Sequence, residues 1–218
     1  MRVAVLGSGT VGQTLAERLL QLGHDVRMGS RKAAGPAQQW AERAGVRASA
    51  GDFADAAEFG ELIVNATAGA RSLDAIRQAG ARNLAGKVLL DVANPIGIGG
   101  GGGGVTLTVA NTDSLAEQIQ REVPAARVVK SLNTLNATVM VNPELVPGAH
   151  VLFLSGDDPH AKQTVRDLLA SFGWPAERII DLGALATARG TEAYLLIWLA
   201  MWRSVGHPQF NIAIESAR

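Results

Sequence analysis

The chain has 218 residues, and its 20 basic residues balance its 20 acidic ones. A protein without net charge has no long-range field to attract nucleic acid or an acidic membrane surface, so we expect neither as a partner. The absence of cysteine excludes disulfides, thiolate metal sites and a cysteine nucleophile.

Neither end of the chain carries a predicted targeting or membrane segment. The apolar run that starts at Met1 is broken by Gly7, which is too early for a signal peptide. The most apolar stretch, Ala193 to Trp202, has half of the roughly 20 residues that a membrane span needs. We therefore expect a cytoplasmic protein.

Short runs rich in leucine or β-branched residues alternate with longer amphipathic segments, which is typical of βαβ units on a mostly parallel sheet. The predicted fold is α/β, a Rossmann-type doubly wound sheet with a small C-terminal helical piece. The dinucleotide-binding domain is placed at residues 1–183, and residues 184–218 are expected to complete the substrate cleft or a dimer contact. Strands are predicted near 2–6, 25–29, 46–48, 62–66, 87–92, 126–131, 150–155 and 178–182, and helices near 11–22, 35–44, 52–58, 71–80, 112–122, 137–141, 159–172 and 187–206.

Several helix boundaries are signalled by single residues. Gly23 follows the first helix where a left-handed C-cap would lie, and Asp113 or Ser114 is a candidate N-cap for the helix that ends before Pro124. Six consecutive glycines, Gly99 to Gly104, predict a mobile loop, because ordering glycine costs the most conformational entropy.

A glycine motif follows the first strand directly and opens the first helix: Gly7, Ser8, Gly9, Thr10, Val11 and Gly12. This context predicts a dinucleotide site, with the first glycine for the tight turn, the second for approach to the pyrophosphate and the third for close helix packing. A ligand-free turn is the alternative, but it would need only one glycine.

The end of the second strand indicates which nicotinamide cofactor is bound. An NAD site would carry an acidic residue there, but Asp25 lies at the other end of this strand. Ser30, Arg31 and Lys32 instead suit a 2′-phosphate, through a hydroxyl donor, a bidentate guanidinium and a point charge. NADP is therefore the predicted cofactor, and a solvated basic turn is the alternative.

Several candidate residues follow the later strands at the carboxyl edge of the sheet, where ligands bind in open α/β folds. Ala66, Thr67, Asn94, Pro95 and Asn133 are candidates to line the nicotinamide and the second substrate. Each of them could equally be a turn residue that caps the next helix.

No catalytic or metal-binding residue is predicted. The four histidines are scattered without the spacing of a metal site. Lys130 is the one ionisable side chain beside the predicted ligand edge, and without a partner it is a weak candidate for a general acid.

The chain resembles the NADP oxidoreductases that use the deazaflavin coenzyme F420, and the related cytoplasmic nucleotide domain of six-transmembrane ferric reductases. The resemblance covers nearly the whole length. It rests on Gly7 to Gly12, Gly29 to Lys32, Asn94-Pro95, Val128 to Asn133, Ser155 to Asp158, Asp181 to Leu185 and Ala188 to Glu192.

The resemblance implies direct hydride transfer between NADP(H) and F420, with the two rings stacked at the carboxyl edge of the sheet. Asn133 is closer to the ferric-reductase domain, because F420 enzymes often have histidine there. Since no membrane portion follows Arg218, a stand-alone reductase is expected. Reduction of free flavin or of a small carbonyl or imine compound is one alternative, and a non-catalytic redox sensor is another.

The segment from Tyr194 to Trp202 is apolar on every face, which a surface helix of a monomer could not sustain. Burial under the sheet or at a homodimer contact is expected. Trp198 and Trp202 are interpreted as core residues, with a cofactor wall as the less favoured role.

Overall fold

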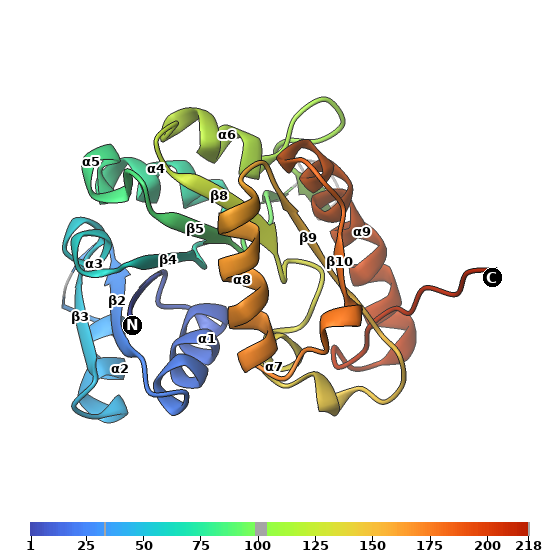
Figure 1. The fold of residues 1–218 in the computed structure, drawn as a ribbon, viewed down its shortest axis with the longest axis horizontal. Helices are drawn as coiled ribbons and strands as arrows, with labels where there is room; N and C mark the ends of the chain where they lie inside the picture. Colours follow the sequence, from blue (N-terminus) through green and yellow to red (C-terminus); the bar gives the residue numbers. More distant parts are fainter. Residues whose placement is uncertain (33, 99–103, 218) are drawn as a thin grey trace.

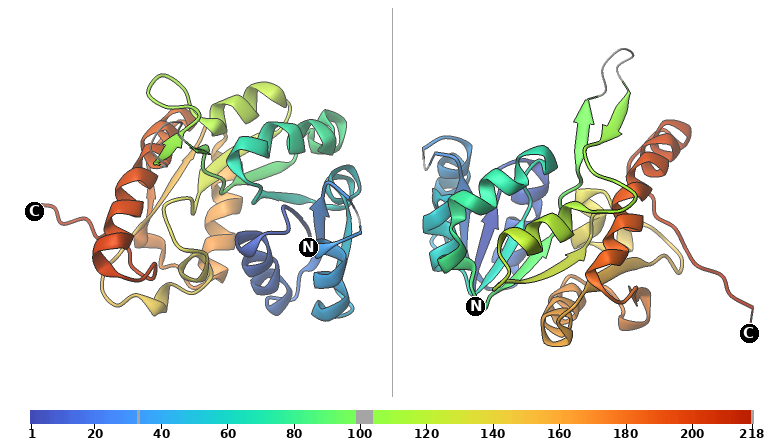
Figure 2. Two further views of the ribbon diagram at one scale, coloured as in Figure 1. Left: turned by 180° about the vertical axis from the view of Figure 1, so that it is seen from behind. Right: turned by 90° about the horizontal axis from the view of Figure 1, so that it is seen from above.

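The computed structural model describes residues 1–32, 34–98 and 104–217. In these residues eight strands form one sheet in the order β10-β9-β8-β5-β4-β1-β2-β3 (Figure 1). The strands of this sheet are β1 (Arg2–Leu6), β2 (Asp25–Ser30), β3 (Ala48–Asp52), β4 (Leu62–Asn65), β5 (Val88–Asp91), β8 (Arg127–Ser131), β9 (Leu152–Gly156) and β10 (Ile179–Asp181). A separate hairpin of β6 (Ile96–Ile98) and β7 (Val105–Leu107) projects from the body (Figure 2).

The sheet is parallel from β3 to β8, and only the β8–β9 pair is antiparallel. This strand order is that of a dinucleotide-binding fold, which confirms the predicted Rossmann-type α/β class. The carboxyl ends of β1, β2, β4, β5 and β8 consequently meet along one edge, where the glycine motif and the later candidates follow them.

Helices cover both faces of the sheet. One layer contains α1 (Thr10–Gln21), α2 (Pro36–Ala44), α7 (Ala137–Val141) and α8 (Pro159–Ser171), and the other contains α3 (Phe53–Phe59), α4 (Gly69–Ala79), α5 (Ala81–Leu84) and α6 (Leu115–Glu122). The last helix, α9 (Ala188–Val205), lies beside the end of the sheet formed by β8, β9 and β10 (Figures 1 and 2). The described residues also form three short 3₁₀ helices, η1 (Pro143–Leu145), η2 (Ala176–Arg178) and η3 (Leu185–Thr187).

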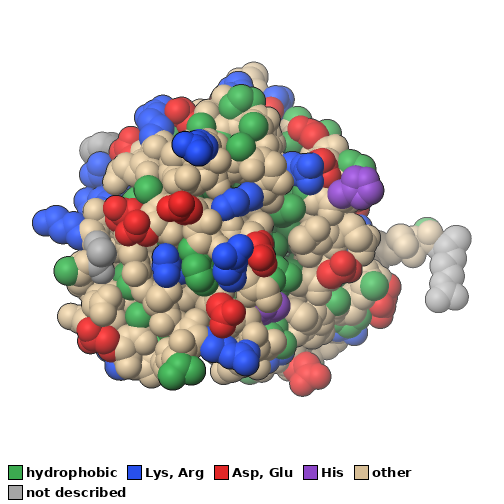
Figure 3. All heavy atoms as spheres, turned by 60° about the vertical axis from the view of Figure 1, so that its left-hand side comes forward, with side chains coloured by type: hydrophobic (Ala, Val, Ile, Leu, Met, Phe, Trp, Pro, Cys, Tyr) green, Lys and Arg blue, Asp and Glu red, His purple; other side chains and the backbone are tan. Residues whose placement is uncertain are grey.

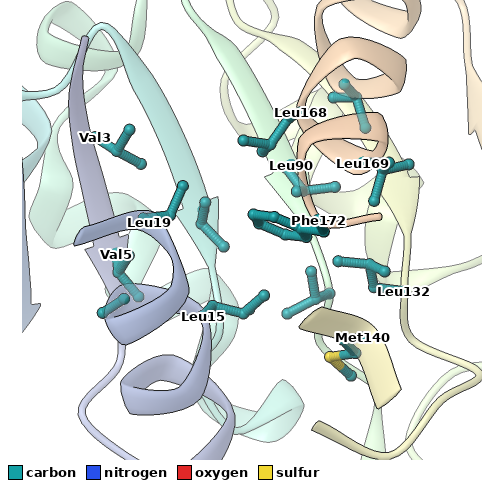
Figure 4. Close-up of a cluster of buried hydrophobic side chains, with 14 of the residues drawn as sticks. Val3, Val5, Leu15, Leu19, Leu90, Leu132, Met140, Leu168, Leu169 and Phe172 are labelled. Atoms are coloured by element: carbon teal, nitrogen blue, oxygen red, sulfur yellow. The ribbon is translucent and has the colours of Figure 1, made fainter. Parts of the chain in front are cut away.

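Each face of the sheet has its own apolar core. In Figure 4, Leu15 and Leu19 of α1 lie on one side of Phe172, and Leu168 and Leu169 of α8 lie on the other. All five side chains are buried, so this cluster joins the first and the last thirds of the chain against the sheet. On the face shown in Figure 3, side chains of both charges are interspersed.

Most predicted elements are confirmed within three residues, and the differences have local causes. β3 begins two residues later than predicted and includes Gly51 and Asp52, because an edge strand paired only with β2 can be built from small and polar residues. The β6–β7 hairpin was not predicted. Gly99 to Gly103 of the expected mobile loop lie outside the described residues.

The cap predictions can be compared directly with the structure. Gly23 follows α1 with a φ of +83°, and Ser114, rather than Asp113, accepts the hydrogen bond from the backbone N–H of Glu117. Asp113 is used in an ion pair with Arg121.

Helix α9 is buried on one face only within the single chain, so burial under the sheet accounts for part of the helix and the expected homodimer contact stays a prediction. Leu195 and Trp198 are buried, whereas Ile197, Trp202 and Val205 are between 41% and 59% exposed. The interpretation of Trp202 as a core residue was therefore wrong, because only one face of α9 meets the sheet. No helix in the described ranges is both long and apolar enough to span a bilayer.

A buried ion cluster holds α9 against the sheet. The Nζ of Lys130, at the end of β8, lies 2.7 Å from the Oδ2 of Asp91 on β5 and 2.8 Å from the Oε1 of Glu192 on α9. Glu192 also accepts hydrogen bonds from the backbone N–H groups of Leu115 and Ala116 at the start of α6. These three charged side chains are at most 2% exposed, so the cluster connects two strands and two helices inside the protein.

The pKa directions reflect this arrangement. Burial alone would lower the pKa of Lys130, but the Asp91 and Glu192 carboxylates together hold that pKa above its usual range. Burial raises the pKa of the Glu192 carboxyl, assisted by the charge of Asp91 and opposed by Lys130. Two carboxylates around one ammonium leave an excess negative charge, which the N-terminal N–H groups of α6 stabilise.

Replacing Lys130 with methionine should lower the free energy of unfolding at pH 7 by about 3–5 kcal/mol, because two buried carboxylates lose their counter-ion. The deficit should shrink as the pH falls towards 5, because burial raises the pKa of Glu192 and protonation of its carboxyl removes an unpaired charge. Urea unfolding at several pH values measures both effects. Arg121→Met breaks a surface ion pair and should cost less than about 1 kcal/mol; equal losses in the two variants would contradict the role of Lys130.

Candidate functional site

The loop between β1 and α1 depends on glycine at two close approaches. Gly7 has a φ of +116°, and a Cβ atom there would lie 2.5 Å from the carbonyl oxygen of Ala66. A Cβ atom on Gly12 would lie 2.0 Å from the carbonyl oxygen of Gly7. Gly9 differs, because nothing in the described protein lies within 4 Å of its ideal Cβ position. The structure itself therefore requires glycine at 7 and 12, whereas the open space at Gly9 is available to a ligand.

The N-terminus of α1 has the features of an anion site. No side chain caps it, and its first turn contains no acidic residue. The first backbone N–H groups of a helix have no acceptor within the helix and carry a partial positive charge. A phosphate placed at Gly9 would satisfy them.

A cleft of about 550 Å³ opens at this helix end. We call it the nucleotide cleft. The carboxyl ends of β1, β2 and β4 form one part of it, and α4 forms the opposite wall. Its lining residues are Gly7, Ser8, Gly9, Ser30, Arg31, Phe53, Ala66, Thr67, Ala68, Arg71, Asp74, Ala75 and Gln78.

Two guanidinium groups line the nucleotide cleft from different walls. Arg31 follows β2, and Arg71 lies in the first turn of α4. Among the described residues neither side chain has an ion pair or a hydrogen-bond partner, whereas Arg77 on the same helix pairs with Glu122 at 2.8 Å. The cleft therefore presents two unpaired cations to whatever occupies it, and the one acidic side chain in its described lining, Asp74, pairs with Arg77 at 3.5 Å.

The basic turn after β2 is only partly arranged as predicted. The hydroxyl of Ser30 donates to the carbonyl oxygen of Lys32 at 2.5 Å, so it stabilises the turn. Lys32 is exposed and does not line the cleft.

A second hollow of about 190 Å³ adjoins the cleft and shares Ala66, Thr67 and Ala68 with it. We call it the ring cavity, because an apolar cavity of about 150 Å³ accommodates a benzene ring. None of its described lining residues carries an ionisable side chain. They are Val11, Ala66, Thr67, Ala68, Gly69, Val92, Ala93, Asn94, Ile96, Asn133, Leu135, Met140, Leu195 and Trp198.

Two asparagines fix the wall of the ring cavity. The amide nitrogen of Asn94 donates to the backbone oxygen of Asn133 at 2.7 Å, and the amide nitrogen of Asn133 donates to the side-chain oxygen of Asn94 and to the carbonyl of Thr191, both at 3.0 Å. Leu132, buried just before Asn133, has a φ of +63°. A leucine held in this region costs conformational energy, which the surrounding contacts must offset. The loop after β8 is therefore held in one shape.

A series of hydrogen bonds between largely buried polar side chains holds Thr67 in position. Its hydroxyl lies 2.7 Å from the side-chain oxygens of both Asn65 and Ser72. Asn65 in turn donates to Asp91 at 2.8 Å, which joins Thr67 to the ion cluster of Lys130. Lys130 is thus a buried structural cation that lines neither hollow, so it cannot serve as the general acid considered from the sequence.

The structure brings most of the predicted residues into the two hollows. Gly7, Ser8, Gly9, Ser30, Arg31, Ala66 and Thr67 line the nucleotide cleft, and Val11, Ala66, Thr67, Asn94 and Asn133 line the ring cavity. Thr10, Gly12, Lys32 and Pro95 line neither.

Sequence reasoning missed Arg71 and the cavity-lining position of Trp198. A cation in the first turn of a helix opposes the helix dipole, which is a signal that could have singled out Arg71. No comparable signal exists for Trp198, since an apolar helix is ordinarily core.

Two of the motifs that carry the family resemblance lie at the opposite edge of the sheet, because β9 runs antiparallel to β8. There Asp157 accepts a hydrogen bond from the backbone of Leu185, and Asp158 caps α8 by accepting from the backbone of Ala161. These motifs hold the C-terminal segment in place and do not contribute to either hollow.

Comparison with known proteins identifies the protein family of this chain. The model of the NADP oxidoreductases described as coenzyme F420-dependent matches residues 2–95. The crystal structure of a candidate F420-dependent NADP reductase from Arthrobacter sp. FB24 is 47% identical, covers 99% of this chain and 100% of its own, and superposes with a TM-score of 0.92. The chain belongs to the coenzyme F420-dependent NADP oxidoreductase family. The resemblance inferred from the sequence is thereby confirmed, and the chain is an NADP-dependent oxidoreductase whose family cofactors are NADP and F420.

Two more distant proteins are similar to this oxidoreductase over most of its length. The metalloreductase STEAP3 of Rattus norvegicus is 29% identical over 203 residues, which are 93% of this chain but only 38% of the length of STEAP3. An imine reductase from Myxococcus stipitatus, solved with NAD⁺, is 19% identical over 94% of this chain and 63% of its own, with a TM-score of 0.61. The imine reductase shows a common fold only.

Alanine at Gly9 should reduce the affinity for NADPH, whereas alanine at Gly12 should reduce the stability of the oxidoreductase. Gly9→Ala should change the free energy of unfolding by less than about 0.5 kcal/mol, because the backbone angles of Gly9 suit alanine and the added Cβ would contact no described atom. The same variant should weaken NADPH binding at least tenfold, because the Cβ would block close approach of the phosphate. Gly12→Ala should lower the free energy of unfolding by about 1–3 kcal/mol through overpacking against Gly7. Urea unfolding and NADPH titration of both variants separate the effects; undiminished NADPH affinity in Gly9→Ala would remove that residue from the site.

Proposed function

We propose that this protein transfers a hydride between NADP(H) and coenzyme F420. The proposal is based on the difference in charge between the residues that line the two hollows. The nucleotide cleft has unpaired guanidinium groups at a glycine-loop helix N-terminus, and the adjoining ring cavity has no ionisable side chain among its described residues. Hydride exchange between two redox cofactors needs orientation and exclusion of water rather than an acid or a base.

In this proposal the nucleotide cleft holds the adenosine half of NADP(H). Gly7, Ser8 and Gly9, with the backbone of Thr10, Val11 and Gly12, hold the pyrophosphate at the start of α1. Arg31 and Arg71 bind the 2′-phosphate from opposite walls, with support from Ser30 and Lys32. Two cations around one phosphate dianion suit NADP(H), whereas the paired hydroxyls of NAD(H) would ask for an acidic acceptor.

The ring cavity receives the nicotinamide ring. When bound, the two cofactors supply the hydride donor and acceptor. The residues of this chain orient the rings: Ala66 and Thr67 separate the ring from the phosphates, while Asn94 and Asn133 shape the opposite wall. Pro95, which does not line the cavity, restricts the backbone that follows Asn94. The apolar side chains of Val11, Leu135 and Met140 exclude water, which strengthens the polar contacts that remain.

The alternative functions would require different residues around the nicotinamide ring. Reduction of a carbonyl or an imine calls for a proton donor beside the acceptor, and the described lining of the ring cavity holds no acid stronger than a threonine hydroxyl. Free flavin as the acceptor would make the same demands as F420, so it remains the second candidate. A redox sensor would bind NADPH without turnover.

Three further parts of the proposal concern the whole protein. We also propose that the dinucleotide-binding domain ends at residue 183, that the protein is cytoplasmic and that it forms a homodimer. The exposed apolar side chains of Ile197, Trp202 and Val205 on α9 offer a surface for a second copy, which the mass of the purified protein in solution tests.

Arg31→Ala and Arg71→Ala should each weaken NADPH binding about 10–100-fold, the loss expected for a charge-assisted hydrogen-bond pair. NADH binding should change less than twofold, because NADH lacks the 2′-phosphate. Titration of both cofactors measures the difference. Arg82→Ala is the control, since Arg82 is exposed and lines neither hollow; equal losses of NADPH and NADH affinity in the Arg31 variant would refute the phosphate assignment.

Anaerobic mixing of the protein with NADPH and oxidised F420 should bleach the deazaflavin absorbance, with riboflavin as the parallel acceptor. Bleaching of F420 at a rate well above that with riboflavin is the expected result. Bleaching of riboflavin alone would select the flavin reductase, and NADPH binding without turnover of any acceptor would favour the sensor.

A further inference from the structure

The segment that follows α9 is tied to the chain that leads into β9. The side-chain amide nitrogen of Asn211 donates to the backbone oxygen of Val151 at 2.7 Å and lies 2.9 Å from the Nδ1 of His150. The backbone N–H of Val151 donates to the oxygen of Ile212 at 2.9 Å, and His150 forms an antiparallel bridge with Ala213. We call this group of contacts the Asn211 anchor.

His150 is buried in this anchor, and both of its ring nitrogens are used. Because the amide nitrogen of Asn211 faces the Val151 carbonyl, it is a donor, and the Nδ1 of His150 must be the acceptor. The Nε2 then carries the hydrogen and donates to the backbone oxygen of Pro143 at 3.0 Å. The imidazole also packs edge-on against Trp174, with ring centroids 5.2 Å apart and the planes at 82°.

The contacts of the Asn211 anchor lead to two walls of the ring cavity. Phe210, which immediately precedes the anchor, stacks on the indole of Trp198 with ring centroids 5.3 Å apart and the planes at 23°. On the other side, the indole nitrogen of Trp174 donates to the backbone oxygen of Met140 at 3.0 Å. Trp198 and Met140 both line the ring cavity. His150 therefore connects the wall formed by α9 with the wall formed by α7.

Packing alone sets the orientation of the Trp198 indole. Its Nε1 has no hydrogen-bond partner among the described residues, so no polar contact there holds the ring. The indole is in contact with Phe210 and, at 5.3 Å and a tilt of 57°, with Trp202. Trp202 is 41% exposed, whereas Phe210 is held in place through its neighbour Asn211. Phe210 is consequently the more firmly fixed of the two aromatic supports.

We propose that the Asn211 anchor, acting through Phe210, holds Trp198 in place and thereby sets the width of the ring cavity for a flat redox ring. Phe210, Asn211 and His150 are positioning residues, since none of them is among the described residues that line the cavity. Catalytic geometry of this kind depends on supporting contacts behind the residues that meet the ligand. The inference rests on the proposed function only in that a redox ring enters this cavity.

The test compares four variants of the segment after α9. Phe210→Leu removes the aromatic face but keeps an apolar side chain, Phe210→Tyr keeps the ring, and Asn211→Ala removes both hydrogen bonds of the anchor amide. Ile214→Ala is the control, because Ile214 is an exposed residue of the same segment beyond the anchor. NADPH and adenosine 2′,5′-bisphosphate, which has no nicotinamide, are titrated, and kcat and KM are measured with F420 and with riboflavin.

Phe210→Leu and Asn211→Ala should each weaken NADPH binding about 3–10-fold, because the nicotinamide would meet a cavity wall that is no longer fixed. They should also lower kcat about tenfold or more, since misplacing reacting atoms by about 1 Å can cost about 100-fold in rate. Adenosine 2′,5′-bisphosphate should bind within twofold of wild type, because it occupies only the nucleotide cleft. Phe210→Tyr and Ile214→Ala should remain within twofold of wild type in every measurement.

Unchanged NADPH affinity and kcat in Phe210→Leu would overturn the inference. Equal weakening of NADPH and adenosine 2′,5′-bisphosphate would overturn it too, because a general loss of structure affects both ligands, as would a Phe210→Tyr variant as impaired as Phe210→Leu. The outcome is separable from that of the proposed function. Normal F420 reduction by Phe210→Leu would remove the inference and leave the function standing. In a protein that reduces no F420, the NADPH titrations would still decide the role of Phe210.

Discussion

The structure around the candidate site depends on the buried ion cluster of Lys130, Asp91 and Glu192. A charge removed from water is tolerated only when it is paired and hydrogen-bonded, so these side chains must meet in one arrangement. That requirement places the start of α9 beside the carboxyl ends of β5 and β8 and against the first turn of α6. Because Asp91 also accepts from Asn65, the same cluster sets the loop that carries Thr67. The walls of the ring cavity are consequently positioned by electrostatics beneath it, and no member of the cluster is exposed to the ligand.

Charge is distributed in the site according to the part of the ligand that each region would meet. Unpaired cations and free helix N–H groups lie at the nucleotide cleft, where phosphates would be bound, and uncharged side chains surround the ring cavity. A dry, uncharged cavity suits hydride transfer, because a stray proton donor would open side reactions. The short loop of Ala66, Thr67 and Ala68 is the common wall of both regions, and the glycine requirement at Gly7 follows from its contact with Ala66.

The sequence was informative where local geometry and ligand chemistry coincide. The glycine motif was recognised because its spacing directly follows one predicted strand and opens one predicted helix, and Arg31 because it follows the second strand directly. Arg71 was missed since its partner wall lies forty residues earlier in the chain. Trp198 was interpreted as a core residue, because its apolar neighbours in the sequence do not reveal that one helical face meets a cavity. The β6–β7 hairpin was missed as well, since its strands have three residues each and lie on either side of a glycine run.

By itself the sequence determined the α/β class, the position of the dinucleotide fingerprint, the preference for a phosphate-bearing cofactor and the family resemblance. All of these follow from short-range patterns: alternation of strand and helix, spacing of glycines, and the residue types at the end of one strand. Only the tertiary structure decided that Lys130 is enclosed by two carboxylates, that Arg71 faces the nucleotide cleft with Arg31, and that Trp198 lines the ring cavity. Those facts depend on contacts between segments far apart in the chain, which the packing of α9 and α4 against the sheet creates and no local pattern encodes.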